Sequence, residues 1–142
     1  MPTLQGAIDE IIAVIAAVDG INYAPSDPTL QANIWPTAIT YATNGRVAET
    51  RASIEDISLH DIAIAVVQPL GDLVQATQAL LPLYEPIIDA LIDHLNGRTS
   101  NHYSAWRNVE YTLAPIDWPS GDVYYGYIFV IKEVKIQNDI SG

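Results

Sequence analysis

The segment Asp56–Gln68, DISLHDIAIAVVQ, has the clearest strand pattern in the first half of the chain. Its large apolar residues form two alternating runs of opposite parity: Ile57 and Leu59, then Ile62, Ile64 and Val66. Successive side chains of a strand point to opposite faces of the sheet. The change of phase at His60-Asp61 therefore predicts a β-bulge, or a strand that crosses from the edge of a sheet into its interior.

The residues before this strand predict a loop and a hairpin. Prolines are frequent in residues 20–36, which indicates a loop, and Thr37–Thr43 alternates like a half-buried strand. Asn44-Gly45 predicts a type I′ turn, because both residues tolerate a positive φ. The returning arm, Arg46–Ser53, is polar, so we expect it to be exposed or covered by a partner chain.

Apolar residues at helical spacing predict three helices: Thr3–Val18, about 71–81 and about 83–95. The last two are separated because Pro82 and Pro86 each lack a backbone donor and collide with the preceding turn of a continuous helix. Asn96-Gly97 is expected to end the third helix with a left-handed cap.

Two further strands follow, Asn108–Leu113 and Tyr124–Ile136, with a turn at Pro115–Asp122. This order predicts one α+β domain over residues 1–142. The N-terminal helix and the central helical region should pack on one face of a mixed or antiparallel sheet of about five strands. The hairpin at Asn44-Gly45 should protrude from that sheet. The other face is expected to expose aromatic residues.

Composition excludes several classes of function. Six Lys and Arg against seventeen Asp and Glu give a formal net charge of −11, which disfavours binding to nucleic-acid phosphates and to anionic membrane surfaces. The absence of cysteine excludes a disulfide framework, a thiolate zinc site and a cysteine nucleophile. The first basic residue is Arg46, so we expect no secretory signal, and the longest apolar run, Ile62–Val67, is too short to cross a bilayer.

No catalytic, cofactor or metal residue is predicted. His60, His94 and His102 are scattered without the spacing of a helical zinc site. His60 and Asp61 are neighbours on a strand and should point to opposite faces. Asp89 and Asp93, beside His94, are interpreted as a solvated helix face rather than a cation site, and no Gly-rich phosphate loop is present.

Aromatic residues crowd the C-terminal strand: Tyr124, Tyr125, Tyr127 and Phe129, with Trp106, Tyr111 and Trp118 nearby in sequence. Stacking on single-stranded nucleic acid would pair such residues with many cations, which this region lacks. Packing in the core or at a subunit interface is the favoured use, and ligand binding is the lesser alternative.

Several segments together carry a family resemblance: Tyr23-Ala24-Pro25, Trp35-Pro36-Thr37-Ala38, the Asp56–Val66 strand with its Leu-His-x-Ile pattern, Asp72-Leu73, and a final run with Tyr111, Leu113, Trp118 and Tyr125-Gly126-Tyr127-x-Phe129. In this order the chain resembles the tail terminator (tail completion) proteins of long-tailed bacteriophages, from about residue 4 to about residue 137. Pro82 and Pro86 depart from the pattern by breaking the helical middle.

The resemblance implies a non-enzymatic structural protein of the virion tail and neck, assembled in the host cytoplasm and needing no cofactor. Such proteins form rings, usually hexamers, that cap the tail tube and end its polymerisation. The implied partners are other copies of the chain, the tail tube protein and a head-closure or connector protein. DNA would pass through the ring without specific binding, since an anionic wall repels phosphates.

The hairpin supplies the first candidate contacts with neighbouring subunits or the tube: Asn44, Gly45, Arg46 and Arg51. Tyr125 and Tyr127 of the C-terminal strand are further candidates, and the loop Tyr23–Trp35 is a second docking candidate. For each arginine, simple exposure on a solvated hairpin is an equal alternative.

Three other interpretations stay open. The chain could be a different neck or tail component: a head-closure protein, a head–tail connector or a tube subunit, the last of which would form long tubes. It could be a small acidic enzyme or ligand-binding domain that uses His60 and Asp61. It could also mimic DNA, although its carboxylates are spread along the whole chain.

Overall fold

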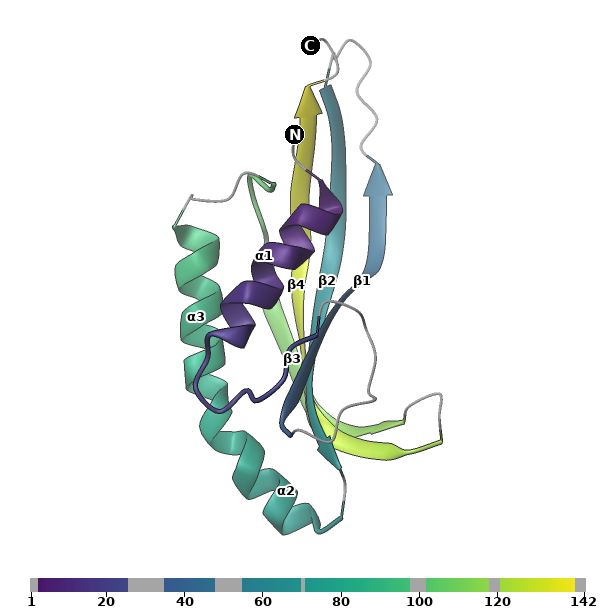
Figure 1. The fold of residues 1–142 in the computed structure, drawn as a ribbon. Coiled ribbons are helices and arrows are strands. Elements are labelled where there is room, and N and C mark those ends of the chain that lie inside the picture. Colours follow the sequence, from purple (N-terminus) through teal and green to yellow (C-terminus); the bar gives the residue numbers. More distant parts are fainter. Residues whose placement is uncertain are drawn as a thin grey trace.

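Helices cover one face of a twisted antiparallel sheet (Figure 1). The computed structural model describes residues 3–25, 35–47, 55–69, 71–97, 102–117 and 121–139. The helices are α1 (Leu4–Ala16), α2 (Leu73–Leu80), the short 3-10 helix η1 (Leu81–Leu83) and α3 (Tyr84–Asn96). The strands are β1 (Thr37–Val47), β2 (Glu55–Pro69), β3 (Asn108–Asp117) and β4 (Val123–Asp139).

The sheet has the order β1-β2-β4-β3, and every neighbouring pair is antiparallel. The predicted α+β class, with helices on one face, is confirmed. Within the described ranges the sheet has four strands instead of about five. The predicted strand Thr37–Thr43 and the start of the predicted returning arm at Arg46 are both parts of the single strand β1.

The predicted turn at Asn44-Gly45 is wrong. Strand β1 continues through both residues to Val47, and they pair with Asp61 and His60 of β2. Gly45 has no positive φ. A Cβ at Gly45 would lie 2.7 Å from Nδ1 of His60, so glycine serves here to admit a neighbouring side chain rather than to make a turn.

Local signals place the helix boundaries. The Thr3 hydroxyl accepts a hydrogen bond from the Gly6 N–H at 2.9 Å at the start of α1, and Asp72 caps α2 in the same way. Pro82 lies in η1 and Pro86 in the first turn of α3, where a missing N–H costs little, so the predicted break is confirmed. The expected left-handed cap is wrong, because Gly97 has φ −70°.

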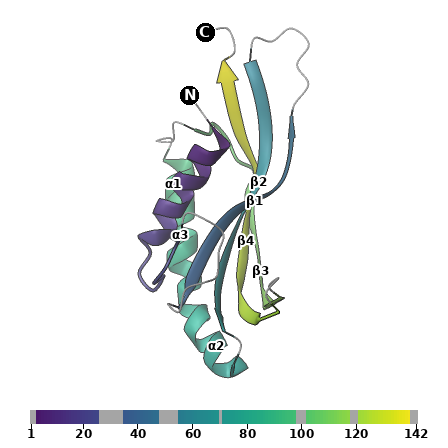
Figure 2. The same cartoon turned by 45° about the vertical axis from the view of Figure 1, so that its right-hand side comes forward.

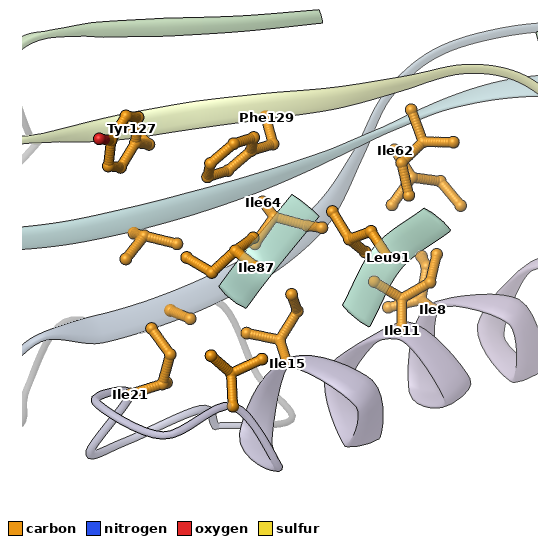
Figure 3. Close-up of a cluster of buried hydrophobic side chains, with 14 of the residues drawn as sticks. Ile8, Ile11, Ile15, Ile21, Ile62, Ile64, Ile87, Leu91, Tyr127 and Phe129 are labelled. Atoms are coloured by element: carbon orange, nitrogen blue, oxygen red, sulfur yellow. The ribbon is translucent and has the colours of Figure 1, made fainter. Parts of the chain in front are cut away.

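The core lies between α1, α3 and the sheet (Figure 3). Ile11 and Ile15 of α1 and Ile87 and Leu91 of α3 are fully buried. They belong to one apolar cluster with residues of β2 and β4, including the fully buried Phe129. Burying large apolar side chains in this way is the dominant stabilising contribution to the fold.

The other face of the sheet carries a smaller apolar cluster. Ala65, Val67 and Tyr124 are buried there, with Trp35 and Tyr41 packed partly against them. The expectation that this face exposes its aromatic residues is therefore wrong for these side chains. Among the aromatic residues that the structure describes, Tyr111 on β3 is the most exposed, at 51%. Its ring contacts Tyr84 on the helix side.

The phase change at His60-Asp61 marks a double irregularity in the sheet. A bulge is present at the predicted level, but its extra residues belong to the neighbouring strands β1 and β4 and not to β2. Thr43 is the extra residue of β1, between the pairs Ala42↔Ile62 and Asn44↔Asp61. On the other side, two β4 residues lie opposite Asp61 alone. Bulges increase local twist, and the strands cross sharply at this level before β2 and β4 extend past the helices (Figure 2).

Candidate functional site

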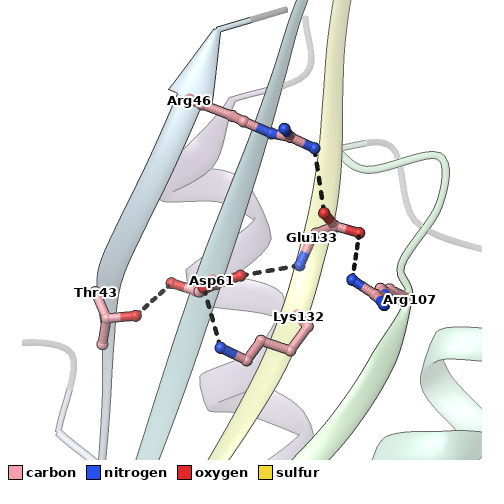
Figure 4. A network of polar contacts seen from close by, with 6 residues as sticks. All are labelled: Thr43, Arg46, Asp61, Arg107, Lys132 and Glu133. Atoms are coloured by element: carbon pink, nitrogen blue, oxygen red, sulfur yellow. Dashed lines mark hydrogen bonds and ion pairs between the residues drawn. The ribbon is translucent and has the colours of Figure 1, made fainter.

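Asp61 holds the bend together at its centre (Figure 4). One carboxylate oxygen, Oδ1, accepts a hydrogen bond from the Glu133 backbone N–H at 3.1 Å. The other, Oδ2, accepts one from Lys132 Nζ at 3.4 Å, and the Thr43 hydroxyl donates to the Asp61 carbonyl at 3.2 Å. The side chain is only 19% exposed, so these bonds replace water at the irregular positions of both flanking strands.

Glu133 is the bulged residue of β4. Its φ of 54° lies in the left-handed region, which costs a residue with a side chain about 1–2 kcal/mol. Its carboxylate lies 3.2 Å from Arg46 of β1 and 3.8 Å from Arg107, which precedes β3. Both arginine side chains are more than two-thirds exposed, so each pair contributes little.

These residues surround a polar hollow of about 370 Å³ on the side of the bend away from the helices. Its charged lining has equal numbers of each sign: Arg46, Arg107 and Lys132, with Asp61, Glu110 and Glu133. Because the two signs are present in equal number, the hollow offers little net charge to an ionic ligand. The network ties three strands together at the bend.

The structure separates the residues predicted for the interface. Asn44, Gly45 and Arg46 line the hollow, and Arg46 is engaged by Glu133 of its own chain. Arg51 lies outside the described residues. Tyr125 is half-buried against the core. Tyr127 is 2% exposed, so this side chain is a core residue and is removed from the candidate contacts.

The second docking candidate is described only at its ends. The Tyr23 carbonyl accepts a hydrogen bond from the Ala38 N–H at 2.8 Å, so it pairs with the start of β1. Residues 26–34 lie outside the described part of the chain, as does Trp118.

Two of the scattered histidines meet at one carboxylate, which spacing alone did not predict. His94 Nε2 of α3 lies 3.7 Å and His102 Nε2 lies 4.0 Å from oxygens of Glu10 on α1. Tyr103 lies beside them, and its burial together with the negative charge of Glu10 raises its pKa to about 12. His60 instead lies 2.8 Å from the Ser58 hydroxyl.

These groups do not assemble into a metal site. Among the described residues, no cluster of three His, Asp or Glu side chains could hold a metal ion. Nor does this part of the chain contain a helix long and apolar enough to span a membrane.

The two outer strands of the sheet differ in charge. Strand β1 carries Arg46 as its only charged residue, and the Val47 side chain at its end is 73% exposed. Strand β3 carries Glu110 and Asp117 and no cation. Each edge therefore presents exposed apolar surface next to charge of a single sign.

An aromatic groove of about 520 Å³ runs beside β3, between that strand and the η1–α3 junction. Tyr84 and Tyr111 line it with ring centroids 4.9 Å apart, and Leu81 at its rim is 51% exposed. Burial, followed by the nearby Tyr111 and Glu85, raises the pKa of Tyr127 at the base of the groove. This is a surface on which apolar side chains of another chain can pack.

No family model matches the chain, and no curated protein matches it in sequence.

Proposed function

We propose that this chain is a structural virion protein, a tail terminator that assembles into a ring on the tail tube, stops its polymerisation and docks the head connector. The observation that carries the proposal is the pair of dissimilar outer strands in one sheet. An edge strand with unused backbone donors and acceptors is a template for pairing with another chain. A molecule with two different edges can join copies head to tail.

The shape and charge of the chain support the same role. Strands β2 and β4 extend beyond the helices (Figures 1 and 2). The helices of the same chain do not cover this extension, which leaves it available for contact with another subunit. A formal charge of −11 suits a ring through which DNA passes, because an anionic wall repels phosphates. The hexameric state of the ring, and the tube protein and head-closure protein as its partners, are implied by the family resemblance.

Mass measurement in solution, combined with negative-stain imaging of the purified chain, tests the proposal. Closed rings of uniform mass are the expected result. Long tubes would favour the tube subunit instead. A stable monomer at all concentrations, including in the presence of purified tail tubes, would contradict the terminator role.

The hollow at Asp61 favours one second candidate, a small ligand-binding domain. Its balanced charges would suit a zwitterionic metabolite, which needs a cation and a carboxylate close together. Native mass spectrometry of the freshly purified chain tests this candidate. A retained small molecule that is lost in Asp61→Asn would support it, and an unliganded mass would contradict it.

A further inference from the structure

We propose that the ring is closed by the sheet itself: β1 of one copy pairs antiparallel with β3 of the next, with Val47 opposite Tyr111. This inference rests on the proposed ring and names the surfaces that form it. The occupant of the groove beside β3 is then a second copy of this chain.

Strand direction permits this contact. In the order β1-β2-β4-β3 every neighbouring pair is antiparallel, so β1 and β3 run in opposite directions. A rotation about an axis roughly along the strands preserves their directions. It therefore brings β1 of one copy antiparallel to β3 of the next, and repetition of a head-to-tail contact closes a ring.

Charge favours unlike edges over like edges. Arg46 is the only charged residue of β1, whereas β3 carries Glu110 and Asp117. Two β3 strands side by side would place carboxylates together, which is destabilising. Pairing β3 with β1 brings Arg46, which also contacts Glu133 of its own chain, close to Glu110.

The exposed apolar residues share a face in the same arrangement. Tyr111 pairs with the core residue Phe129. Val47 pairs with Ser58, and Ser58 pairs in turn with the core residue Ile136. Directly paired residues share a face of the sheet, so Val47 lies on the core side as well. In a continuous sheet, Val47 next to Tyr111 would cover the aromatic groove.

That register also defines the polar face. With Val47 opposite Tyr111, Arg46 lies opposite Thr112, and Glu110 is its diagonal neighbour, within reach of a long side chain. In this register β1 overlaps β3 over seven residues, with Tyr41–Val47 opposite Tyr111–Asp117. Pro115 lacks an N–H and is tolerated on an edge strand, so pairing is expected mainly along Tyr111–Ala114, opposite Val47–Asn44.

Disulfide trapping tests this register, because the chain contains no cysteine. Directly opposite residues of antiparallel strands have Cα atoms about 4.5–5.5 Å apart, within the range that a disulfide spans. A mixture of Val47→Cys and Tyr111→Cys chains should form a covalent dimer on mild oxidation. Neither variant should do so alone, and the double variant should give a ladder ending at the size of the ring.

A second pair protects the test against misfolding of Tyr111→Cys. Arg46→Cys and Thr112→Cys replace exposed side chains and should cross-link in the same mixed experiment. Leu73→Cys on α2, 53% exposed and away from both edges, is the matched control. It should not cross-link to Val47→Cys.

The possible results test the edge pairing and the ring separately. Rings without mixed cross-links would overturn the edge pairing and leave the ring standing. A dimer from Val47→Cys alone or Tyr111→Cys alone would show like-edge pairing and overturn the head-to-tail contact. Absence of both rings and cross-links, including in the presence of purified tail tubes, would overturn both proposals. Cross-linked chains that form no closed ring under the same conditions would support the edge contact and contradict the terminator.

Discussion

The two parts of strand β2 on either side of Asp61 are stabilised in different ways. Residues Ile62–Val67 are at most 1% exposed, with apolar packing on both faces of the sheet. Residues Ser58–Asp61 are only half-buried and lie in the polar network of the bend. One strand thus combines a region held by apolar burial with a region held by hydrogen bonds and ion pairs, and the two should respond differently to mutation and salt.

Removing a core side chain from the apolar region should have the largest effect. Phe129→Ala deletes a fully buried ring and leaves a cavity, so we expect the free energy of unfolding to fall by about 3–5 kcal/mol. Urea denaturation measures this. Leu73→Ala, at a residue 53% exposed, should change it by no more than about 0.5 kcal/mol; equal losses in the two variants would show that the region is not packed as described.

The backbone of the apolar region is also closely packed. A Cβ at Gly126 would clash with the carbonyl oxygen of Val66 on the paired strand, and the strands would have to separate. Gly126→Ala should therefore destabilise the protein by about 1–3 kcal/mol, as other overpacked sites do. Gly71→Ala is the matched control, since a Cβ at Gly71 would meet nothing within 4 Å; a neutral Gly126→Ala would contradict the register of β2 and β4.

At the bend, Asp61→Ala removes the acceptor of the Glu133 N–H and the partner of Lys132. We expect a loss of about 1–3 kcal/mol, the usual result of leaving a partly buried donor without an acceptor. Asp61→Asn keeps a side-chain oxygen that can accept from the Glu133 N–H, so it should reduce the free energy of unfolding by less. If the two variants unfold at the same urea concentration, the carboxylate does not stabilise the bend through that bond.

Alkaline pH should loosen the junction of α1 and α3 beside Tyr103. Its pKa of about 12 in the folded protein exceeds the ordinary value of 10.0, so the folded state holds the phenol proton more tightly. This contribution is fully present below pH 10 and is lost as the pH rises through about 12. Urea denaturation across this range should show a shallower decline for Tyr103→Phe than for the unmodified chain; an identical decline would argue against the buried phenol.

The smallest effect is expected for the exposed ion pair of the bend. Arg46→Ala removes the 3.2 Å contact with Glu133, but the arginine side chain is 68% exposed. The loss should be at most about 1 kcal/mol and should vanish in about 1 M salt. Arg107→Ala removes a longer contact with Glu133, of 3.8 Å, and should reduce the free energy of unfolding by less. A salt-independent loss at Arg46 would indicate a buried contact instead.

Local sequence patterns predicted much of the fold. The apolar stripe of α1 and the prolines at the start of η1 and α3 report preferences that act within a few residues. The phase change at His60-Asp61 likewise located the bend, because a strand must keep its apolar residues on the buried faces of a sheet. These predictions succeeded since each depends on neighbours along the chain.

The site was predicted less well for the opposite reason. Asp61 meets Lys132 and Glu133, about 70 positions later in the chain, and no local pattern specifies that pairing. The meeting of Glu10 with His94 and His102 also depends on how separate segments pack. An interface hypothesis drawn from residue type alone therefore placed Tyr127 on the surface, whereas the helices bury it.

By itself, the sequence determined an acidic α+β chain without cysteine, its helices, and the position at which its central strand changes phase. Only the tertiary structure decided that Asn44-Gly45 continues a strand, that two bulges flank Asp61, and that the dissimilar strands β1 and β3 form the two edges. The physical reason is the separation along the chain of the residues that determine each feature. Helical periodicity and strand alternation are read from adjacent residues, whereas pairing register and side-chain burial are set by contacts between distant parts of the chain.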